Sequence, residues 1–468
     1  MKVALIKPPV TYADWYRRPV LGMAYIASYL RMHGFECAIF DAYYHGWTEP
    51  KLLARVEAYK PDVIGFSAMT HEVTRAAEIA EKLKKRLGVP VIVGGSHATA
   101  IPARTLEQFP VFDYGVCGEG ERSLLEALRC LEAQRPAELQ AVKGIVFRDK
   151  GRVQVNDPAP LLTSEELDAL PFPVFDEYYG DAGDALKGKE GCYVLMTTRG
   201  CPFNCAFCTR TMGKQVRRRS AEKVCLEMEQ AIARYSAHTF DFYDDIMIYD
   251  NKESRGLLQM MIDRRLPERA RWCGVTRADL VRPDLMALAK RAGCFRLGIG
   301  VESGDDEILK AVGKGTTVAQ VKEAVRTIKE AGIAVDAYFI LGHPNETRET
   351  LRKTVKLSTQ LKTDMIAVGL MVPYPGTRIF DMAQNGQCGY RLLSEDWSQY
   401  DKYGGRVLEV EGLSYAELAK WQRRAVINFY VKNLKVRDGA RYFWKRRRAV
   451  GFLLKQRITS RLGRARAT

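Results

Sequence analysis

Three cysteines lie within eight residues of one another in the stretch "TTRGCPFNCAFCTR", and their spacing is typical of a metal centre. Cys201, Cys205 and Cys208 form a C-x3-C-x2-C pattern. The other cysteines are scattered without regular spacing, and we expect them to be reduced and mostly buried thiols. A structural zinc site takes four ligands, usually as two paired knuckles, and the chain has no second CxxC pair. A redox pair of Cys205 and Cys208 would not need the third thiol.

A four-iron, four-sulfur cluster accounts for three thiolates better than zinc or a redox pair, because it leaves one iron without a protein ligand and open to another molecule. The pattern resembles the radical S-adenosylmethionine (SAM) family, whose hallmark is CxxxCxxC with an aromatic residue before the last cysteine, here Phe207. The resemblance implies that SAM chelates the open iron through its amino and carboxylate groups. An electron from the cluster would then cleave SAM and produce a 5′-deoxyadenosyl radical.

Further segments resemble SAM-contacting segments of the same family. "FYDDIM" is similar to the segment that holds the methionyl amino group, although a solvated acidic strand end is the alternative. "GVESG" resembles the ribose-contacting strand, and "FILGHPNET" the segment that shapes the adenine site. The arginine of "TRADL" could meet the SAM carboxylate or form a surface salt bridge. The candidate SAM-binding residues are Phe207, Asp244, Asp245, Arg277, Glu302, Gly342 and His343.

The elements that must position these residues alternate between apolar strands and helical patterns from about residue 191. Six strand candidates follow one another: "CYVLMTTR", "TFDFYDD", "RWCGVTR", "CFRLGIGVES", "AVDAYFILG" and "DMIAVGLMV". They predict a parallel barrel or part-barrel with its active site at the carboxyl ends of the strands. The cysteine cluster comes directly after the first strand, where a barrel enzyme keeps its chemistry.

The first 135 residues show the same alternation and predict a separate parallel sheet that is covered by helices on both faces. Ligands of such sheets bind at the carboxyl ends of the strands. Here these ends read "KPPV", "FSAMT", "GGSHAT" and "GEGE", and are rich in Gly, Ser or Thr. The chain has neither a GxGxxG fingerprint nor a GxxxxGK[ST] loop, so no phosphate-binding signature is present.

We therefore expect an α/β protein with four regions. Residues 1–140 form a doubly wound, Rossmann-like domain of the flavodoxin type, and residues 141–190 a hairpin and a linker. Residues 191–384 form a partial (β/α)6 barrel. Residues 385–468 form a small helical region that ends in a basic amphipathic tail.

A doubly wound domain in front of such a barrel resembles the cobalamin-binding radical SAM proteins, in which the corrin lies between the two domains. The likeness extends over roughly residues 1 to 390. Cobalamin domains that supply a histidine to cobalt use DxHxxG, whereas "DAYYHG" has Tyr43 at the histidine position, so we expect no histidine on cobalt. The implied cobalamin contacts are Pro8, Pro9, Ser67, Gly94, Gly95, Ser96, Thr99, Gly118 and Glu119.

The resemblance implies three cofactors, a 4Fe-4S cluster, SAM and cobalamin, and a function as a methyltransferase. Reduced cobalt would take a methyl group from one SAM, and a substrate radical made with a second SAM would capture it from methylcobalamin. The alternatives are a radical cyclisation or ring rearrangement with the same cofactors, a radical enzyme whose amino-terminal domain no longer binds corrin, and a non-catalytic cobalamin or metal sensor. An electron donor such as flavodoxin or ferredoxin is the implied partner.

The net charge of +16 is concentrated at the carboxyl end, where residues 431–468 hold thirteen Lys or Arg against Asp438 alone. In a helix, Phe443, Val450, Leu454 and Ile458 would share one face, which predicts either a basic amphipathic helix on an anionic membrane or a helix packed on the barrel. A lipid-type substrate would suit the former. We expect a cytoplasmic protein, because the start lacks a signal peptide and no apolar run could span a bilayer. We expect no nucleic-acid partner.

Overall fold

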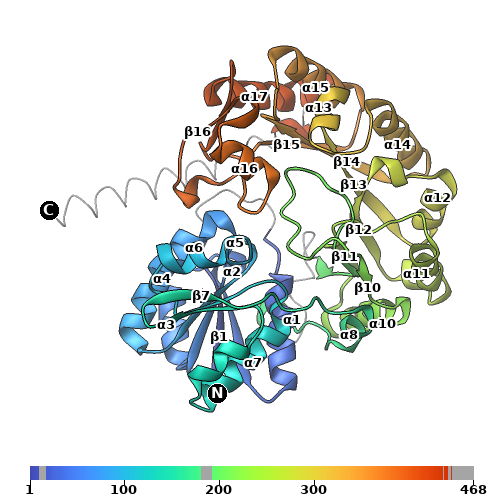
Figure 1. The fold of residues 1–468 in the computed structure, drawn as a ribbon. Coiled ribbons are helices and arrows are strands. Elements are labelled where there is room, and N and C mark those ends of the chain that lie inside the picture. Colours follow the sequence, from blue (N-terminus) through green and yellow to red (C-terminus); the bar gives the residue numbers. More distant parts are fainter. Residues whose placement is uncertain (10–16, 181–191, 436, 441–443, 445–468) are drawn as a thin grey trace.

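The computed structural model describes residues 1–9, 17–180, 192–435, 437–440 and 444 of the chain. Two parallel sheets dominate it, one in the blue to teal part of the ribbon and one in the green to orange part (Figure 1). Phe443, Val450, Leu454 and Ile458, which we expected to share one helical face, lie outside the described residues.

The amino-terminal sheet has the strand order of a flavodoxin-type fold, β2-β1-β3-β4-β5, followed by β6 and β7. β1 pairs in parallel with β2 on one side and β3 on the other, so the strand order reverses between β1 and β3. Ligands of such sheets bind at this switch point. The parallel strands are β1 (Lys2–Lys7), β2 (Glu36–Asp41), β3 (Val63–Ser67), β4 (Val91–Gly94) and β5 (Tyr114–Val116).

Helices cover both faces of this sheet, as the near-continuous apolar strands predict. In β1, Val3 and Leu5 enter the core shared with α1 and α7, whereas Ala4 and Ile6 enter the core shared with α3 and α4. This alternation follows from the two-residue period of a strand. The covering helices are α1 (Leu21–Met32), α3 (Glu49–Tyr59), α4 (Val73–Leu87), α5 (Ser96–Ala100), α6 (Pro102–Gln108) and α7 (Gly120–Glu132).

The predicted hairpin extends the amino-terminal sheet. β6 (Ile145–Asp149) pairs antiparallel with β5, and β7 (Arg152–Val155) pairs antiparallel with β6. The boundary that we expected at residue 140 therefore cuts through this sheet, because the pairing of β6 with β5 is a long-range contact that the hairpin sequence does not reveal.

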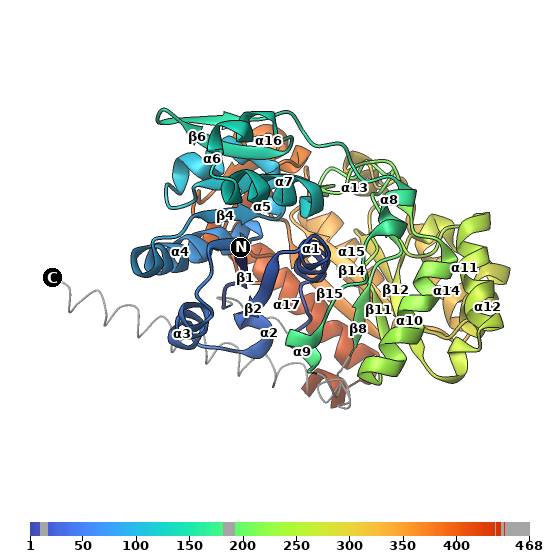
Figure 2. The same ribbon diagram turned by 90° about the horizontal axis from the view of Figure 1, so that it is seen from below.

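Up to residue 180, the expected linker is a packed segment with two short helices, α8 (Ser164–Ala169) and α9 (Asp176–Tyr179). Leu162, Leu167 and Phe175 are buried in the same core that contains α1 and the first barrel strand. Figure 2 shows α8 lying between α1 and the helices of the second sheet. The two domains thus share one continuous apolar core.

The second sheet contains the six predicted strands in the order β15-β14-β13-β12-β11-β8, all parallel. β8 and β15 form its two edges, so the barrel is partial, as expected. Its strands are β8 (Tyr193–Leu195), β11 (Thr239–Phe242), β12 (Arg271–Thr276), β13 (Cys294–Glu302), β14 (Ala334–Leu341) and β15 (Met365–Leu370). Its main helices are α10 (Ala221–Tyr235), α11 (Lys252–Asp263), α12 (Pro283–Arg291), α13 (Asp306–Ala311), α14 (Val318–Glu330) and α15 (Arg348–Gln360).

The described part of the carboxyl-terminal region contains a short ribbon as well as a helix. After α16 (Arg378–Gln384) it forms a ribbon of β16 (Tyr390–Leu392) and β17 (Leu408–Val410), and then α17 (Tyr415–Lys432), which packs against β15 and α15. Between the two ribbon strands, the Trp397 indole N–H donates to Gln108 of the amino-terminal domain at 2.7 Å. Among the described residues, no helix combines the length and apolarity needed to cross a membrane.

Candidate functional site

The loop that carries the three cysteines is closed at its base by a short antiparallel ribbon. β9 (Thr198–Arg199) precedes the loop and β10 (Arg217–Arg218) follows it, and the two strands pair directly. Gly200 begins the loop with φ of +96°, and a Cβ there would clash with the carbonyl oxygen of Gln215. Glycine is required at this point, because both the backbone conformation and the space exclude a side chain.

The cysteines occupy different environments within the loop. Cys205 is buried, Cys201 is half-buried and Cys208 is exposed. The loop is fixed from within the barrel, since the Ala206 amide donates to the carbonyl of Val312 at 2.8 Å. No group of three or more His, Cys, Asp or Glu side chains in the described ranges is arranged around one metal ion. A cluster in which each thiolate binds a different iron does not need such convergence.

Two buried cations lie next to the cysteine loop. The Arg277 guanidinium is 4.0 Å from the Cys205 sulfur and lies over the Phe203 ring, 3.5 Å from its centroid. A hydrogen bond from the Cys208 thiol, followed by the positive charges of Lys314 and Arg277, lowers the pKa of Cys205, and the same hydrogen bond raises the pKa of Cys208. Thiolate is the form that binds metal, and the two cations beside Cys205 favour that form.

Lys314 is a functional candidate that the sequence did not reveal. Its ammonium group forms a buried ion pair with Glu302, 2.8 Å from Oε1. Arg277 also donates to the Lys314 carbonyl oxygen at 2.6 Å. Lys314 lies in a loop, "VGKGTT", that carries no motif, and its proximity to Cys205 arises only from the fold.

The two aspartates of "FYDDIM" have different surroundings. Asp244 is buried, and its carboxylate accepts hydrogen bonds from the backbone and side chains of Thr197 and Thr198. It thereby ties the end of β11 to the start of the cysteine loop. Asp245 is exposed, and within the described part of the chain no hydrogen bond to its carboxylate is found. Of the two, Asp245 is the one available to a ligand.

The adenine-site candidates follow β14 and face the same edge of the sheet. Gly342 has φ of +93°, and the His343 ring lies edge-on to Phe207 with centroids 6.3 Å apart. Burial lowers the pKa of His343 to about 4, so its imidazole is neutral at pH 7. Glu346 accepts hydrogen bonds from the amides of both Gly342 and His343, which holds this turn in shape.

The candidate cobalamin contacts gather at the carboxyl edge of the first sheet. Pro8 and Pro9 follow β1, and Ser67 ends β3, so they flank the switch point. Gly95 has φ of +100°, and a Cβ there would lie 2.6 Å from the carbonyl oxygen of Ala68. At this edge the backbones of Gly95 and Ala68 thus lie so close together that no side chain fits between them.

The next two strand ends are joined to each other by Thr99. Its hydroxyl donates to the Gly95 carbonyl at 2.9 Å and accepts from the Gly118 amide at 3.0 Å. Gly94 and Ser96 flank Gly95 at the end of β4. Glu119 turns away from this group, and its carboxylate binds the Arg217 guanidinium at 2.8 Å.

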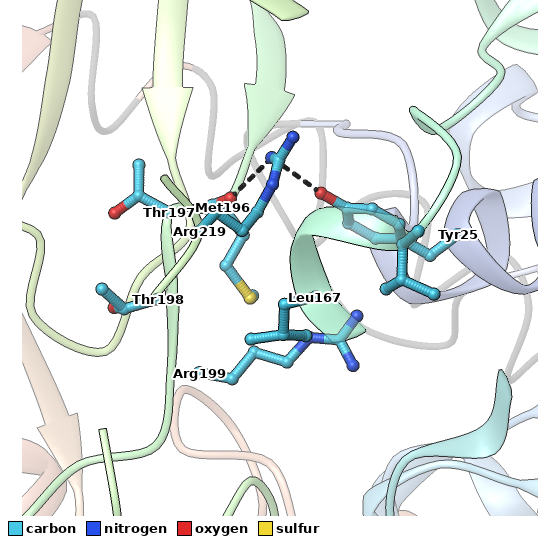
Figure 3. Close-up of a pocket in the computed structure, with 8 residues that line it drawn as sticks. Tyr25, Leu167, Met196, Thr197, Thr198, Arg199 and Arg219 are labelled. Atoms are coloured by element: carbon cyan, nitrogen blue, oxygen red, sulfur yellow. Dashed lines mark hydrogen bonds between the residues drawn. The ribbon is translucent and has the colours of Figure 1, made fainter. Parts of the chain in front are cut away.

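The cavity in Figure 3 lies behind the cysteine loop at the seam between the domains, and it has room for about one water molecule. Arg219 crosses it and donates to the Tyr25 hydroxyl at 3.1 Å and to the Met196 carbonyl at 3.0 Å. This space is too small for a cofactor. The cavity is lined by Tyr25, Leu167, Leu170, Met196, Thr197, Thr198, Arg199 and Arg219.

Comparisons with known proteins agree with both halves of this architecture. The profile of the radical SAM superfamily matches residues 195–358, and that of the B12 binding domain matches residues 16–128. The uncharacterized methyltransferase PH0819 of Pyrococcus horikoshii is 30% identical over 443 residues, which cover 92% of this chain and 93% of the relative. The anaerobic magnesium-protoporphyrin IX monomethyl ester cyclase of Cereibacter sphaeroides is 27% identical over 428 residues, covering 88% and 67%.

Solved structures share the fold over nearly the whole chain. The radical SAM methyltransferase TsrM from Kitasatospora setae, with cobalamin and a 4Fe-4S cluster bound, has a TM-score of 0.72 at 19% identity, covering 92% of this chain and 88% of its own. The cobalamin-dependent radical SAM enzyme OxsB has a TM-score of 0.71 at 21% identity, covering 91% and 65%. The predicted fold class and family are confirmed. This chain belongs to the radical SAM superfamily, in the group of enzymes whose barrel follows an amino-terminal B12-binding domain.

Proposed function

We propose that this protein transfers a methyl group, through methylcobalamin, to an unactivated carbon of a small-molecule or lipid-type substrate. The observation that carries this proposal is the contact between the carboxyl edges of the two sheets. The edge of the barrel sheet bears the cysteine loop, and the edge of the amino-terminal sheet bears the glycine-rich loops. Arg217 at the base of the cysteine loop binds Glu119 beside the end of β5. On another side, Gly376 after β15 lies against Ala100 of α5.

The residues at the barrel edge suit an iron–sulfur cluster and SAM. Three thiols lie in one loop beside two buried cations, which would offset the negative charge of thiolates. In this proposal Cys201, Cys205 and Cys208 hold the cluster. Asp245 takes the amino group of SAM, Glu302 the ribose, and Gly342 and His343 the adenine, with Phe207 beside them, while Arg277 stands beside the cluster. Asp244 instead orders the loop.

The residues at the other edge suit the corrin and its tail. The position of Gly95 excludes a side chain, and the strand ends beside it offer backbone and hydroxyl groups for polar contacts. The proposed contacts are Pro8, Pro9, Ser67, Gly94, Gly95, Ser96, Thr99 and Gly118, whereas Glu119 serves the contact between the domains.

When bound, the cofactors would supply a methyl donor and a hydrogen-abstracting radical, and the protein would contribute placement and exclusion of water. The relatives include proteins named as methyltransferases and others named as cyclases. A relative named as a methyltransferase aligns over more than nine-tenths of both chains, which favours methyl transfer. A cyclisation without methyl transfer is the second candidate, because the cyclases also align over most of this chain.

The electron donor and the membrane contact are further parts of this proposal. We propose a small electron carrier such as flavodoxin or ferredoxin as the source of the electron. A peripheral membrane contact is supported by Ile427, Val431 and Leu434 at the end of α17, which are 46%, 60% and 87% exposed. Exposed cations, Arg423 and Lys432, flank them, and this combination suits an anionic lipid surface.

Anaerobic reconstitution tests the reaction. The purified protein is loaded with iron, sulfide and hydroxocobalamin, and then incubated with SAM and a reductant. We expect 5′-deoxyadenosine, S-adenosylhomocysteine and the absorption spectrum of methylcobalamin. Formation of 5′-deoxyadenosine without methylcobalamin would favour the cyclisation alternative.

The Cys205→Ala variant tests the cluster assignment in the same assay. We expect it to abolish 5′-deoxyadenosine formation, because the remaining two thiols cannot hold the cluster in place. Cys225→Ala serves as the control, since Cys225 is a buried thiol on α10 outside the loop. Undiminished 5′-deoxyadenosine formation by Cys205→Ala would contradict the assignment.

A further inference from the structure

The base of the cysteine loop is held by carboxylates from the other domain. Arg199 and Arg217 face each other in the β9–β10 ribbon and are only 8% and 4% exposed. The Arg199 guanidinium lies 2.6 Å from Glu121 and 3.3 Å from Glu119. Arg217 binds both carboxylate oxygens of Glu119 at 2.8 Å. Both glutamates lie at the start of α7, beside the strand-end edge of the amino-terminal sheet.

Each of these pairs is connected to the cysteine loop by a short covalent or hydrogen-bonded path. Arg199 is followed directly by Gly200 and Cys201. Arg217 donates to the Met212 carbonyl within the loop at 2.6 Å, and to the Leu162 carbonyl of the linker at 2.9 Å. A displacement of the Arg199 guanidinium would therefore move the start of the loop, and a displacement of the Arg217 guanidinium would move its end.

We propose that Glu119 and Glu121 are positioning residues that fix the position of the iron–sulfur cluster relative to the amino-terminal domain. This inference rests on the proposed function, because it assumes that the loop carries the cluster. A buried guanidinium that loses its carboxylate is left as an uncompensated charge, and its surroundings must rearrange or admit water. The loop would then hold the cluster in an altered geometry, although all three cysteines are still present.

The first test compares Glu119→Gln and Glu121→Gln with Glu227→Gln in full-length protein loaded with cluster and hydroxocobalamin. Glu227 lies on α10 of the barrel and forms an equally buried pair with Arg219 at 2.6 Å, so it controls for the loss of a buried carboxylate. The measurements are iron per chain, the electron paramagnetic resonance (EPR) spectrum of the reduced cluster with and without SAM, and the Kd for SAM.

We expect the Glu119 and Glu121 variants to bind iron, to show an altered EPR spectrum in the presence of SAM, and to bind SAM about tenfold or more weakly. We expect Glu227→Gln to keep the wild-type spectrum and affinity. If both Glu119→Gln and Glu121→Gln show the wild-type EPR spectrum and SAM affinity, the proposal is overturned. The same changes in Glu227→Gln would also overturn it, because the effect would then be one of general destabilisation.

A double substitution covers the case in which Glu121→Gln does not fold. Arg199→Gln with Glu121→Gln removes both charges and leaves two amides that can still hydrogen-bond. A folded double variant with an altered EPR spectrum would support the positioning role, and one with the wild-type spectrum would overturn it. Wild-type protein that holds a cluster but transfers no methyl group would count against the proposed reaction only.

Discussion

Glu346 offers a test of the turn that we assign to the adenine site. Its side chain is only 2% exposed and accepts hydrogen bonds from the amides of Gly342 and His343. Burial raises the pKa of this carboxyl to about 7, although both backbone donors favour the charged form. Glu346→Gln keeps the size of the side chain and an oxygen that can accept these hydrogen bonds, but it cannot ionise.

The magnitude follows from the two pKa values of Glu346. An unfolded glutamate has a pKa of about 4.3, and each pH unit between the folded and unfolded values corresponds to about 1.4 kcal/mol. Because the folded pKa is the higher one, the protonated side chain favours the folded state at low pH. This contribution is lost as the pH rises through the folded pKa. The wild type should therefore lose roughly 3 to 4 kcal/mol between pH 4 and pH 8 that Glu346→Gln does not lose.

Differential scanning calorimetry from pH 5 to pH 8 checks this expectation. The melting temperature of Glu346→Gln, relative to that of the wild type, should increase from pH 5 to about pH 7 and then level off. Glu349→Gln is the matched control, because Glu349 lies three residues further along and its side chain is 74% exposed. A melting-temperature difference between Glu346→Gln and the wild type that does not change with pH would refute the reasoning.

Three further changes have defined outcomes. Lys314→Met should cost about 3 to 5 kcal/mol of stability by leaving Glu302 as a buried unpaired charge, and adding Glu302→Gln should recover part of it, as calorimetry can measure. Gly200→Ala should cost at least about 1 kcal/mol and lower the iron bound per chain, because φ there is positive and a Cβ meets backbone. Val431→Glu should reduce the fraction of protein that sediments with vesicles of anionic phospholipid. Ala416→Glu adds the same charge at an exposed position at the other end of α17, and it should reduce that fraction less.

The features that could be predicted from the sequence are those encoded locally. The cysteine loop holds its three thiols within eight residues, and each of the six barrel strands is a mainly apolar segment next to a helical pattern. The glycine-rich strand ends were predictable because parallel strands place their carboxyl ends at one edge. Such features depend on neighbours in the chain or on a repeated unit, and they can therefore be predicted without knowledge of long-range contacts.

The features that could not be predicted depend on pairs that are distant in sequence. The hairpin near residue 150 carries no signal that it pairs with β5. "FYDDIM" offers two equivalent aspartates. Only the fold shows that the Asp244 carboxylate accepts hydrogen bonds from Thr197 and Thr198, which are 47 and 46 residues away. Likewise, nothing near Lys314 indicates that it meets Glu302 beside the cysteine loop.

Glu119 shows how such a distant partner changes the interpretation of a motif. In sequence it belongs to "GEGE", a strand end of the kind that contacts ligands, and a ligand contact was the natural expectation. In the structure its partner is Arg217, 98 residues away. A carboxylate with both oxygens bound to a guanidinium is poorly placed to bind a cofactor as well, since it would have to give up a buried ion pair. The same strand end therefore has two tasks, because Gly118 faces Thr99 in the first domain while Glu119 fixes the loop of the second.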